Sequence, residues 1–550
     1  MNLKTKTNKI KSMLAKTQNT ILSAAFILAI ATGFNAVLGL IKSRLLVQYF
    51  GVSNHLAIFY TADKIPNLIY SVLVIGAFST VFIPVFTEKL KKNKEAAFKS
   101  ASSIINATFM LLVPVGVLII IFAPSILRLI SLGIFSDSEI LLGTNLMRIM
   151  IASQVFLIAG SLITSILQSF KYFLVPALAP ISYNLGMLFG IIFLSPKMGI
   201  YGPALGVVLG SLLHLSIQTP LLKKTGFSFS FSINLKDRGL LETIKLVPPR
   251  LLSVFLSNAV GTINNSLAIF VSTTSVVFLK FATQLQTFPV MLFGLSIASA
   301  SLPTLSRETD EGTPGRFKET FLASLHQTLF LVLPASMFFL ILRIPIVRLV
   351  YGTSNFPWEA TLKTAYILAF FSLSVFAQSA NYLITRAFYA FKDTKTPVLI
   401  YLFTMVINLT ISVVLVVLLK LGVWCIALSF SLTSILDTVV LLYFLGKKIG
   451  GFNFDEILKP FIKISYAAVA MGAALYIPLK ILDEYVFDTT RTLNLLAVVI
   501  IASLVGSTVY LTLTKFFKVK EIELFYKILR KLKLKKPKQI YHHPQPPISA

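Results

Sequence analysis

Cysteine, histidine and acidic residues are scarce in this chain, and each scarcity excludes a class of site. The single cysteine, Cys425, excludes a disulfide framework and a cysteine-ligated metal cluster. Five histidines are too few and too scattered for a zinc site, since the neighbours His542 and His543 have no further ligand nearby. The sequence therefore predicts no metal and no cofactor. Because no His, Asp and Glu side chains converge within the apolar runs, it also predicts that the protein is not an enzyme.

Charge of both signs is rare, and apolar residues dominate. The 550 residues are 56% hydrophobic and 13% charged, with a mean hydropathy of +0.82, which is typical of an integral membrane protein. Lysine and arginine number 50 against 21 acidic residues, a formal net charge of +29. In a soluble protein this excess would suggest nucleic-acid binding. Here the lysine clusters flank apolar spans, so positive-inside topology explains them better, and we expect no nucleic-acid partner.

Apolar runs of about 20 residues, the length that crosses a bilayer, recur along almost the whole chain. The first follows a lysine-rich N-terminus and continues from Ile21 to about Ile41 without a cleavage site, which predicts a retained helix rather than a signal peptide. We expect an all-α protein with about fourteen transmembrane helices, centred near Thr32, Ile69, Val115, Phe156, Met187, Val208, Val260, Val290, Phe330, Phe370, Met405, Ser431, Ala468 and Ser503.

The loops between these spans alternate in charge. Loops 51–56, 132–139, 272–275 and 351–359 contain no lysine or arginine, whereas basic residues gather in segments 88–99, 223–245, 306–319, 391–395 and 446–448 and in the C-terminal tail. Under the positive-inside rule, both termini face the cytoplasm. The predicted location is the cytoplasmic (inner) membrane of a bacterium, with the basic tail held to anionic lipid.

An internal repeat divides the chain. Gly199-Ile200-Tyr201 aligns with Gly422-Val423-Trp424, and residues 123–146 resemble residues 343–366. Parallel repeats of this kind place a substrate site between two halves that rock against each other. We expect an N-terminal six-helix lobe (1–222), a cytoplasmic amphipathic linker (223–245), a C-terminal six-helix lobe (246–448), two additional transmembrane helices (449–516) and a basic cytoplasmic tail (517–550).

Charged residues inside the predicted spans point to the substrate. A charge at bilayer depth costs roughly 2.5–3.5 kcal/mol on insertion scales, so it usually faces a cavity or a partner. Lys42, Arg44, Lys64 and Lys280 give such positions a positive excess, with Asp63 beside Lys64. A cationic cavity suits an anionic substrate. Snorkelling of Lys42 and Arg44 to the membrane surface and self-neutralisation of Asp63 with Lys64 are the alternatives.

Five segments of the chain resemble the MurJ (MviN) lipid II flippases of the multidrug/oligosaccharidyl-lipid/polysaccharide exporter superfamily. The most specific is Arg386-Ala387-Phe388-Tyr389-Ala390 followed by Lys392-Asp393-Thr394; the segments together are 64–88, 174–190, 286–308, 350–361 and 385–412. The resemblance implies alternating-access export of lipid II, the undecaprenyl-diphosphate-linked peptidoglycan precursor, without ATP hydrolysis. It also implies a monomer that contacts membrane lipids and works beside cell-wall synthesis and division proteins.

Only some of the residues that the resemblance implies for substrate transport are present in this chain. Its Arg-Asp pair of the first helix falls on Lys42-Ser43, its Asp-Arg pair of the eighth on Thr283-Gln284, and its arginine of the second on Tyr70. Lys64 matches, and Lys280 lies one helical turn before Gln284. The predicted substrate-binding set is Lys42, Ser43, Arg44, Lys64, Asn67, Arg250, Lys280, Gln284 and Arg386.

Two alternatives stay open at this stage. The substrate of the exporter could be another polyprenyl-diphosphate-linked saccharide. A chain that kept the fold but lost the arginines could also act as a non-transporting scaffold in cell-wall synthesis.

Overall fold

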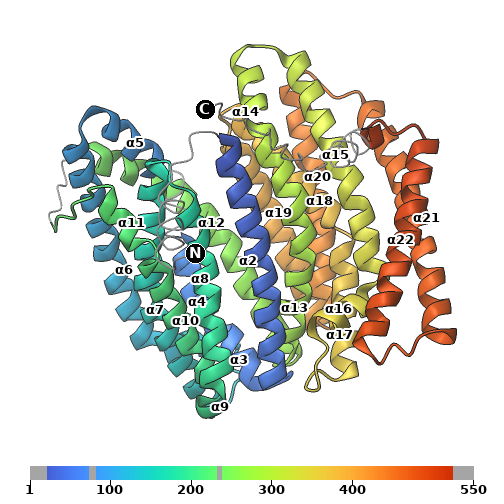
Figure 1. Cartoon of the computed structure of the whole chain (residues 1–550), viewed down its shortest axis with the longest axis horizontal. Helices are drawn as coiled ribbons and strands as arrows, with labels where there is room; N and C mark the ends of the chain where they lie inside the picture. Colours follow the sequence, from blue (N-terminus) through green and yellow to red (C-terminus); the bar gives the residue numbers. More distant parts are fainter. Residues whose placement is uncertain (1–20, 73–81, 232–237, 524–550) are drawn as a thin grey trace, which may run out of the picture.

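The computed structural model describes residues 21–72, 82–231 and 238–523, and all regular elements in these ranges are helices (Figure 1). This confirms the all-α membrane fold. The predicted tail 517–550 lies mostly outside the described residues, and so does the centre of the predicted linker.

Under the predicted division of the chain, the helices belong to a first lobe, a second lobe and a final pair. The first lobe contains α2 (Ile21–Phe50), α3 (Asn54–Ala62), α4 (Lys64–Tyr70), α5 (Ile83–Lys92), α6 (Lys94–Ile130), α7 (Asp137–Ser169), α8 (Leu174–Phe189), the π-helical segment η2 (Gly190–Leu194), α9 (Ser195–Met198), α10 (Tyr201–Ser216) and α11 (Thr219–Lys224). The second contains α12 (Arg238–Val271), α13 (Ser275–Pro289), η3 (Val290–Leu295), α14 (Ser296–Asp310), α15 (Pro314–Ile341), α16 (Arg343–Tyr351), α17 (Trp358–Ser372), α18 (Val375–Ala390), α19 (Lys395–Val413), η4 (Val414–Leu418) and α20 (Trp424–Lys448). The final pair is α21 (Phe454–Tyr485) and α22 (Thr492–Phe516).

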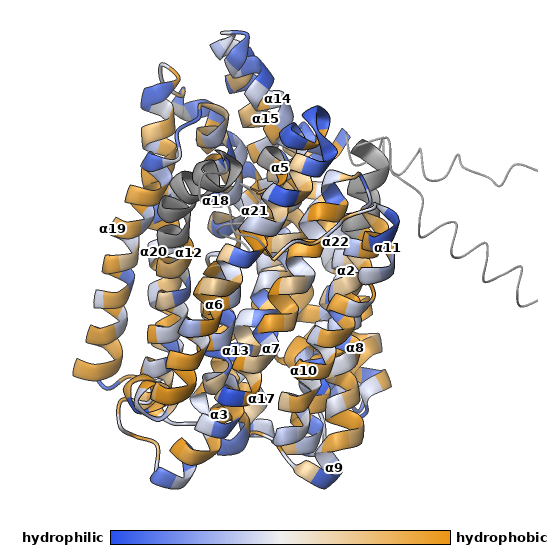
Figure 2. Cartoon of the chain, turned by 90° about the vertical axis from the view of Figure 1, so that its left-hand side faces the viewer, coloured by the Kyte–Doolittle hydropathy of each residue, from blue (hydrophilic) through white to orange (hydrophobic). Residues whose placement is uncertain are grey.

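Figure 1 places α2 between the lobes and the α21–α22 pair at the outer edge of the second lobe. The end of the bundle that carries α3, α9, α16 and α17 is termed here the α3–α16 end, and the opposite one, with α5 and α14, the α5–α14 end. Hydrophilic residues gather at the α5–α14 end, and the middle of the bundle is mainly hydrophobic (Figure 2). The basic loops predicted to share one side of the membrane follow α5, α14 and α18 in the chain.

Twelve single helices or unbroken helical runs in the described residues are long and apolar enough to cross a membrane, and α17 and α18 make a further span bent by 45°. The predicted span around Ile69 is divided, because α3, α4 and α5 are separate helices and residues 73–81 are not described. The prediction of about fourteen spans is consistent with this arrangement.

Helix starts follow from local chemistry. Ser136 accepts a bond from the backbone N–H of Glu139, and the Glu139 carboxylate accepts one from the N–H of Ser136, a capping box that begins α7. The side chain of Asn93 caps α6 in the simpler way, by accepting from the N–H of Ala96.

The repeat is visible in the helices. In each lobe a π-helical segment precedes a helix that begins at Tyr201 or Trp424: η2 is followed by the four-residue α9 and a turn, and η4 by a turn alone. These are aligned positions of the two sequence copies. A π-helical segment in both copies indicates that the local backbone geometry was kept through the duplication.

Glycines let α8 and α10 cross closely. A Cβ placed on Gly186 would lie 2.4 Å from the Cα of Gly210, and one on Gly190 would lie 2.5 Å from the Cα of Gly206. In a bilayer, helices gain little hydrophobic stabilisation from pairing, so backbone approach at small residues is a main source of packing energy. The first lobe therefore depends on this crossing.

The turn between α18 and α19 is held by Asp393. Its carboxylate accepts bonds from the Thr396 N–H at 3.0 Å, the Thr396 hydroxyl at 2.9 Å and the Lys448 Nζ at 2.6 Å. Burial raises the pKa of the Asp393 carboxyl, but the bonds from Lys448 and Thr396 outweigh burial and keep this pKa below its ordinary value. The turn thus ties α19 to the end of α20.

We expect Gly206→Val to lower both the yield and the melting temperature of the purified protein. The added side chain would force α8 away from α10, and overpacking of this kind typically costs about 1–3 kcal/mol. Differential scanning fluorimetry in detergent measures the effect. The matched control is Gly315→Ala, because a Cβ on Gly315 meets nothing within 4 Å; equal melting temperatures for the two variants would contradict the packing argument.

We expect Asp393→Asn to destabilise the protein at neutral pH, since bonds to a charged group contribute roughly 1.5–3 kcal/mol. Because the pKa of Asp393 is depressed, its stabilisation is present above the ordinary pKa of aspartate, about 3.9, and is lost as the pH falls through the depressed value. The difference in melting temperature between wild type and variant should therefore shrink at acidic pH. Asp310→Asn, which removes an exposed carboxylate 3.8 Å from Lys392, should have little effect.

Candidate substrate site between the lobes

Seven of the predicted residues come from three helices that meet where the lobes face each other. Helix α2 contacts α8 of its own lobe and both α13 and α16 of the second lobe. Helix α3 contacts α13, and helix α4 contacts α12. The seven are Lys42, Ser43 and Arg44 on α2, Lys64 and Asn67 on α4, and Lys280 and Gln284 on α13.

Three of these side chains form a cationic cluster. Lys42, Lys64 and Lys280 each interact electrostatically with the carboxylate of Asp63, which stands between α3 and α4. In the described part of the chain, none of the three lysines has a carboxylate within 4.0 Å. Three ammonium groups against one carboxylate leave a positive excess at this interface. The structure therefore brings together residues that are far apart in the sequence.

The ammonium groups of this cluster have weak partners. The Lys42 Nζ lies 3.7 Å from the Met187 sulfur, and the Lys64 Nζ donates to the Gly261 carbonyl at a long 3.4 Å. The Lys280 Nζ lies 5.7 Å from the ring centre of Tyr60. An ammonium group has three donors, so each lysine keeps unused hydrogen-bonding capacity for an anion.

Tyr60 also shows which way Lys280 points. Tyr60 belongs to α3 of the first lobe and Lys280 to α13 of the second, so the exposed lysine reaches an aromatic ring of the opposite lobe. The Tyr60 ring packs edge-on against Phe281, which stacks on Tyr351 with ring centres 4.2 Å apart. Sequence reasoning missed Tyr60, although its position three residues before Asp63 places it on the same helical face.

A neutral hydrogen bond joins Ser43 and Gln284. The Ser43 hydroxyl donates to Gln284 Oε1 at 2.7 Å, and the Ser43 side chain is buried. These are the positions at which the family resemblance places an acid on the first helix and an arginine on the eighth. The two positions face each other in this chain, with a neutral contact.

Arg44 makes a different contact from the lysines. Its Nη1 donates to the carbonyls of Leu349 at 2.8 Å and Val350 at 3.1 Å, in the last turn of α16. Free carbonyls at a helix C-terminus attract cations. A second bond runs nearby from Asn355 Nδ2 to the Gln48 carbonyl at 2.6 Å. These five residues form the α2–α16 clamp, which joins the lobes at the α3–α16 end.

Asn67 bonds its neighbour Asp63, and the two predicted residues outside the seven are Arg250 and Arg386. Asn67 is exposed and donates to the backbone carbonyl and the carboxylate of Asp63. The Arg386 guanidinium stacks over Tyr389 of its own helix, 5.9 Å from the ring centre. Arg250 belongs to a stretch of α12 whose side chains lie outside the described ones.

Polar side chains in the second lobe pair with one another. Asp437, an acid in the middle of α20, accepts from Asn381 Nδ2 at 3.0 Å and from the Thr404 hydroxyl at 3.2 Å. Asn408 donates to the Thr433 hydroxyl at 3.1 Å. Among the residues with described positions, no three His, Cys, Asp or Glu side chains gather as a metal site would require. These contacts tie α18, α19 and α20 together.

Comparison with known proteins assigns the family. Residues 46–514 match the family model described as "Lipid II flippase MurJ". A probable lipid II flippase MurJ of Buchnera aphidicola (subspecies Acyrthosiphon pisum) is 27% identical over 506 residues, covering 91% of this chain and 98% of the relative. The lipid II flippase MurJ of Burkholderia cenocepacia is 25% identical over 425 residues, covering 76% and 82%.

Comparison with solved structures supports the same family. A lipid II flippase MurJ in an inward closed conformation superposes with a TM-score of 0.76 and 26% identity over 92% of this chain and all of that one. An inward-facing MATE multidrug transporter of the MOP superfamily shares the fold, with a TM-score of 0.63, 13% identity, and coverage of 76% of this chain and 94% of its own. By its matched sequence, its fold and its two-lobed arrangement, this chain belongs to the MurJ family of lipid II flippases.

Proposed function

We propose that this chain translocates lipid II from the inner to the outer leaflet of the bacterial cytoplasmic membrane, with both of its own termini on the cytoplasmic side. The observation that carries the proposal is the cluster of Lys42, Lys64 and Lys280 at the interface of two lobes with the MurJ fold. Lipid II has a diphosphate between its lipid tail and its saccharide. The negatively charged diphosphate requires cationic side chains to bind it, and the interface supplies them.

The three ammonium groups supply the binding chemistry. Each charge-assisted hydrogen bond to a phosphate oxygen contributes roughly 1.5–3 kcal/mol. Asp63 lowers the repulsion among the lysines while the site is empty, and an arriving diphosphate takes over part of that role. Because the lysines occupy the interface between lobes, the lipid tail can stay in the bilayer while the head group crosses.

The α2–α16 clamp is suited to gating one side of the site. Arg44 and Asn355 both donate to backbone carbonyls of the opposite lobe, so these bonds must break for the lobes to part at the α3–α16 end. Once that end opens to water, the freed backbone carbonyls accept hydrogen bonds from water, so breaking the clamp costs little free energy. Rocking of one lobe against the other would then expose the lysines alternately to the two membrane faces.

A second cargo is possible on the same chemistry. Another polyprenyl-diphosphate-linked saccharide would present the same diphosphate to the lysines, and the neutral Ser43–Gln284 bond is a specific departure from the family's charged pairs. A non-transporting scaffold in cell-wall synthesis is the alternative outside transport. No catalytic reaction is proposed for the chain, and contacts with cell-wall and division proteins remain part of the proposal.

Rescue of a bacterium depleted of its own lipid II flippase tests the function. We expect the intact chain to restore growth and the exposure of lipid II on the outer leaflet. Lys42→Ala/Lys64→Ala/Lys280→Ala should abolish both, because the diphosphate loses its cationic partners. Arg128→Ala, which removes an exposed arginine at the α3–α16 end of the first lobe, is the control. Rescue by the triple variant at wild-type level would favour the scaffold, and exposure of a different polyprenyl-linked saccharide would favour the other cargo.

Loss of the clamp should open the α3–α16 end. We expect Arg44→Ala to shift the population toward separated lobes roughly 10- to 100-fold, since it removes two bonds from a charged donor. Double electron–electron resonance between labels at Asn54 and Glu359, in a Cys425→Ser background, measures this shift. Arg343→Ala is the control, because the hydrogen bond of Arg343 within the described residues goes to the Leu340 carbonyl of its own lobe; equal distance distributions for the two variants would refute the gating role.

A further inference from the structure

The equivalent arginines of the two repeats have different partners. In the first lobe, Arg128 at the end of α6 pairs with Asp137 at the start of α7, with Nη2 and Oδ1 3.1 Å apart. The constant offset between residues 123–146 and 343–366 aligns Arg128 with Arg348, but it aligns Asp137 with Pro357. The second copy has kept the arginine and lost its carboxylate.

Arg348 is consequently left with weak partners. Its Nη2 donates to the Thr490 carbonyl at 3.4 Å, and its guanidinium lies 5.6 Å from the ring centre of Trp358. In the described ranges no carboxylate lies within 4.0 Å of it. Asp488 is within electrostatic range, but its carboxylate accepts from the Thr490 N–H and faces Arg491 at 3.9 Å. The guanidinium therefore keeps donors for a further acceptor.

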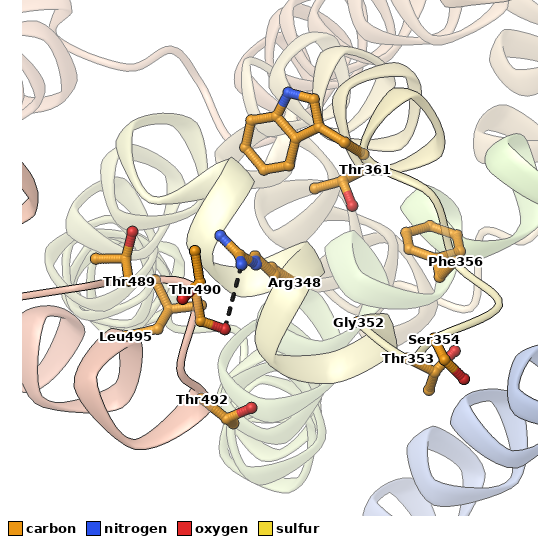
Figure 3. Close-up of a pocket in the computed structure, with 11 residues that line it drawn as sticks. Arg348, Gly352, Thr353, Ser354, Phe356, Thr361, Thr489, Thr490, Thr492 and Leu495 are labelled. Atoms are coloured by element: carbon orange, nitrogen blue, oxygen red, sulfur yellow. Dashed lines mark hydrogen bonds between the residues drawn. The ribbon is translucent and has the colours of Figure 1, made fainter.

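The guanidinium borders a polar cavity of about 340 Å³ between the α16–α17 connection and the start of α22 (Figure 3). Its walls are rich in hydroxyl groups, from Thr353, Thr361 and Thr492 among others, while the Thr490 hydroxyl donates to the Asp488 carboxylate. A volume of this size holds a small polar group, and hydroxyl groups beside an arginine favour an anionic one.

Two threonines of the cavity wall give the second indication of a ligand. Thr361 lines the cavity and only 2% of it is exposed, and the Oγ1 of Thr353, another lining residue, is buried without a hydrogen-bond partner among the residues described. Figure 3 shows Thr361 on one side of Arg348 and Thr492 on the other. Buried polar groups are almost always paired. An unpaired hydroxyl in this place indicates a missing acceptor or donor.

The N-terminus of α22 adds to the positive potential. Its first-turn residues Thr492 and Leu495 line the cavity, and the side chain of Arg491, the N-cap residue, makes no capping bond. The first backbone N–H groups of a helix have no partner within it and attract anions. The arginine, the unpaired hydroxyl and this helix end all border the same cavity.

The surroundings point to a lipid as the source of the anion. Large apolar side chains on both sides of the α21–α22 connection are exposed, Tyr485 by 78% and Leu493 by 79%. Exposed aromatic and aliphatic residues at helix ends are typical of the membrane surface. A head group held at Arg348 would leave its acyl chains near these residues.

We propose that this cavity binds the phosphate group of a membrane lipid at the α3–α16 end of the protein. The last two helices complete the site, because α22 and the residues just before it form one wall. The site is separate from the lysine cluster between the lobes. Its binding can be measured on the purified chain, whichever lipid-linked cargo that chain moves.

The test is isothermal titration of the full chain in detergent with a short-chain phosphatidylglycerol, which dissolves as single molecules. We expect Arg348→Gln to weaken binding roughly 10- to 100-fold, as loss of charge-assisted bonds to phosphate predicts, and Thr361→Val to weaken it several-fold. Arg128→Gln, the repeat-equivalent change, should bind as wild type does. Melting temperatures of all variants check folding, and Thr361→Val keeps the test valid if Arg348→Gln does not fold.

Two further ligands separate the sources of the anion. A short-chain diacylglycerol, which lacks phosphate, should not bind with any dependence on Arg348. Inorganic phosphate should bind far more weakly than the lipid; if it binds as tightly and with the same Arg348 dependence, the lipid assignment is overturned. Equal affinities of Arg348→Gln and Arg128→Gln for phosphatidylglycerol would overturn the site itself.

Discussion

The uncompensated positive charge between the lobes is the constraint on which the arrangement depends. Lys42, Lys64 and Lys280 come from three helices in two lobes, and Asp63 is the carboxylate with which all three interact. Like charges in an apolar interior repel strongly. The interface can stay closed only with an anion present or with neighbouring contacts that hold the lobes together. This is the physical situation that a carrier of diphosphates needs, since an empty site should be less stable than an occupied one.

The neighbouring contacts are of a kind that can be broken and remade. Ser43 and Gln284 share one neutral hydrogen bond, which is worth less than a charged pair. Arg44 and Asn355 use backbone carbonyls rather than carboxylates. None of these contacts leaves an unpaired acid behind when the lobes separate. The family resemblance places charged residues at the positions of Ser43 and Gln284, whereas the contact between them in this chain is neutral.

Duplication explains both the symmetry of the fold and its exceptions. The π-helical segments η2 and η4 recur at matching places, and so do Arg128 and Arg348. Where the copies differ, the difference has a structural consequence. Pro357 stands at the position of the acid that pairs with Arg128, and the Arg348 guanidinium instead donates to the Thr490 carbonyl in the loop before α22. The final helix pair thus does more than enlarge the bundle. It provides one wall of the polar cavity beside Arg348.

The sequence by itself determined the membrane class, the approximate number of spans, the charge of the loops and the duplication, because each follows from local composition and from the thickness of a bilayer. It also indicated the lysines, since charge inside an apolar run is visible without a fold. Only the tertiary structure decided what these residues contact. Arg44 and Lys42 are two positions apart on one helix, yet one bonds α16 and the other lies near Asp63. Two positions around a helix are about 200° apart, so which partner each meets depends on helices packed from distant parts of the chain.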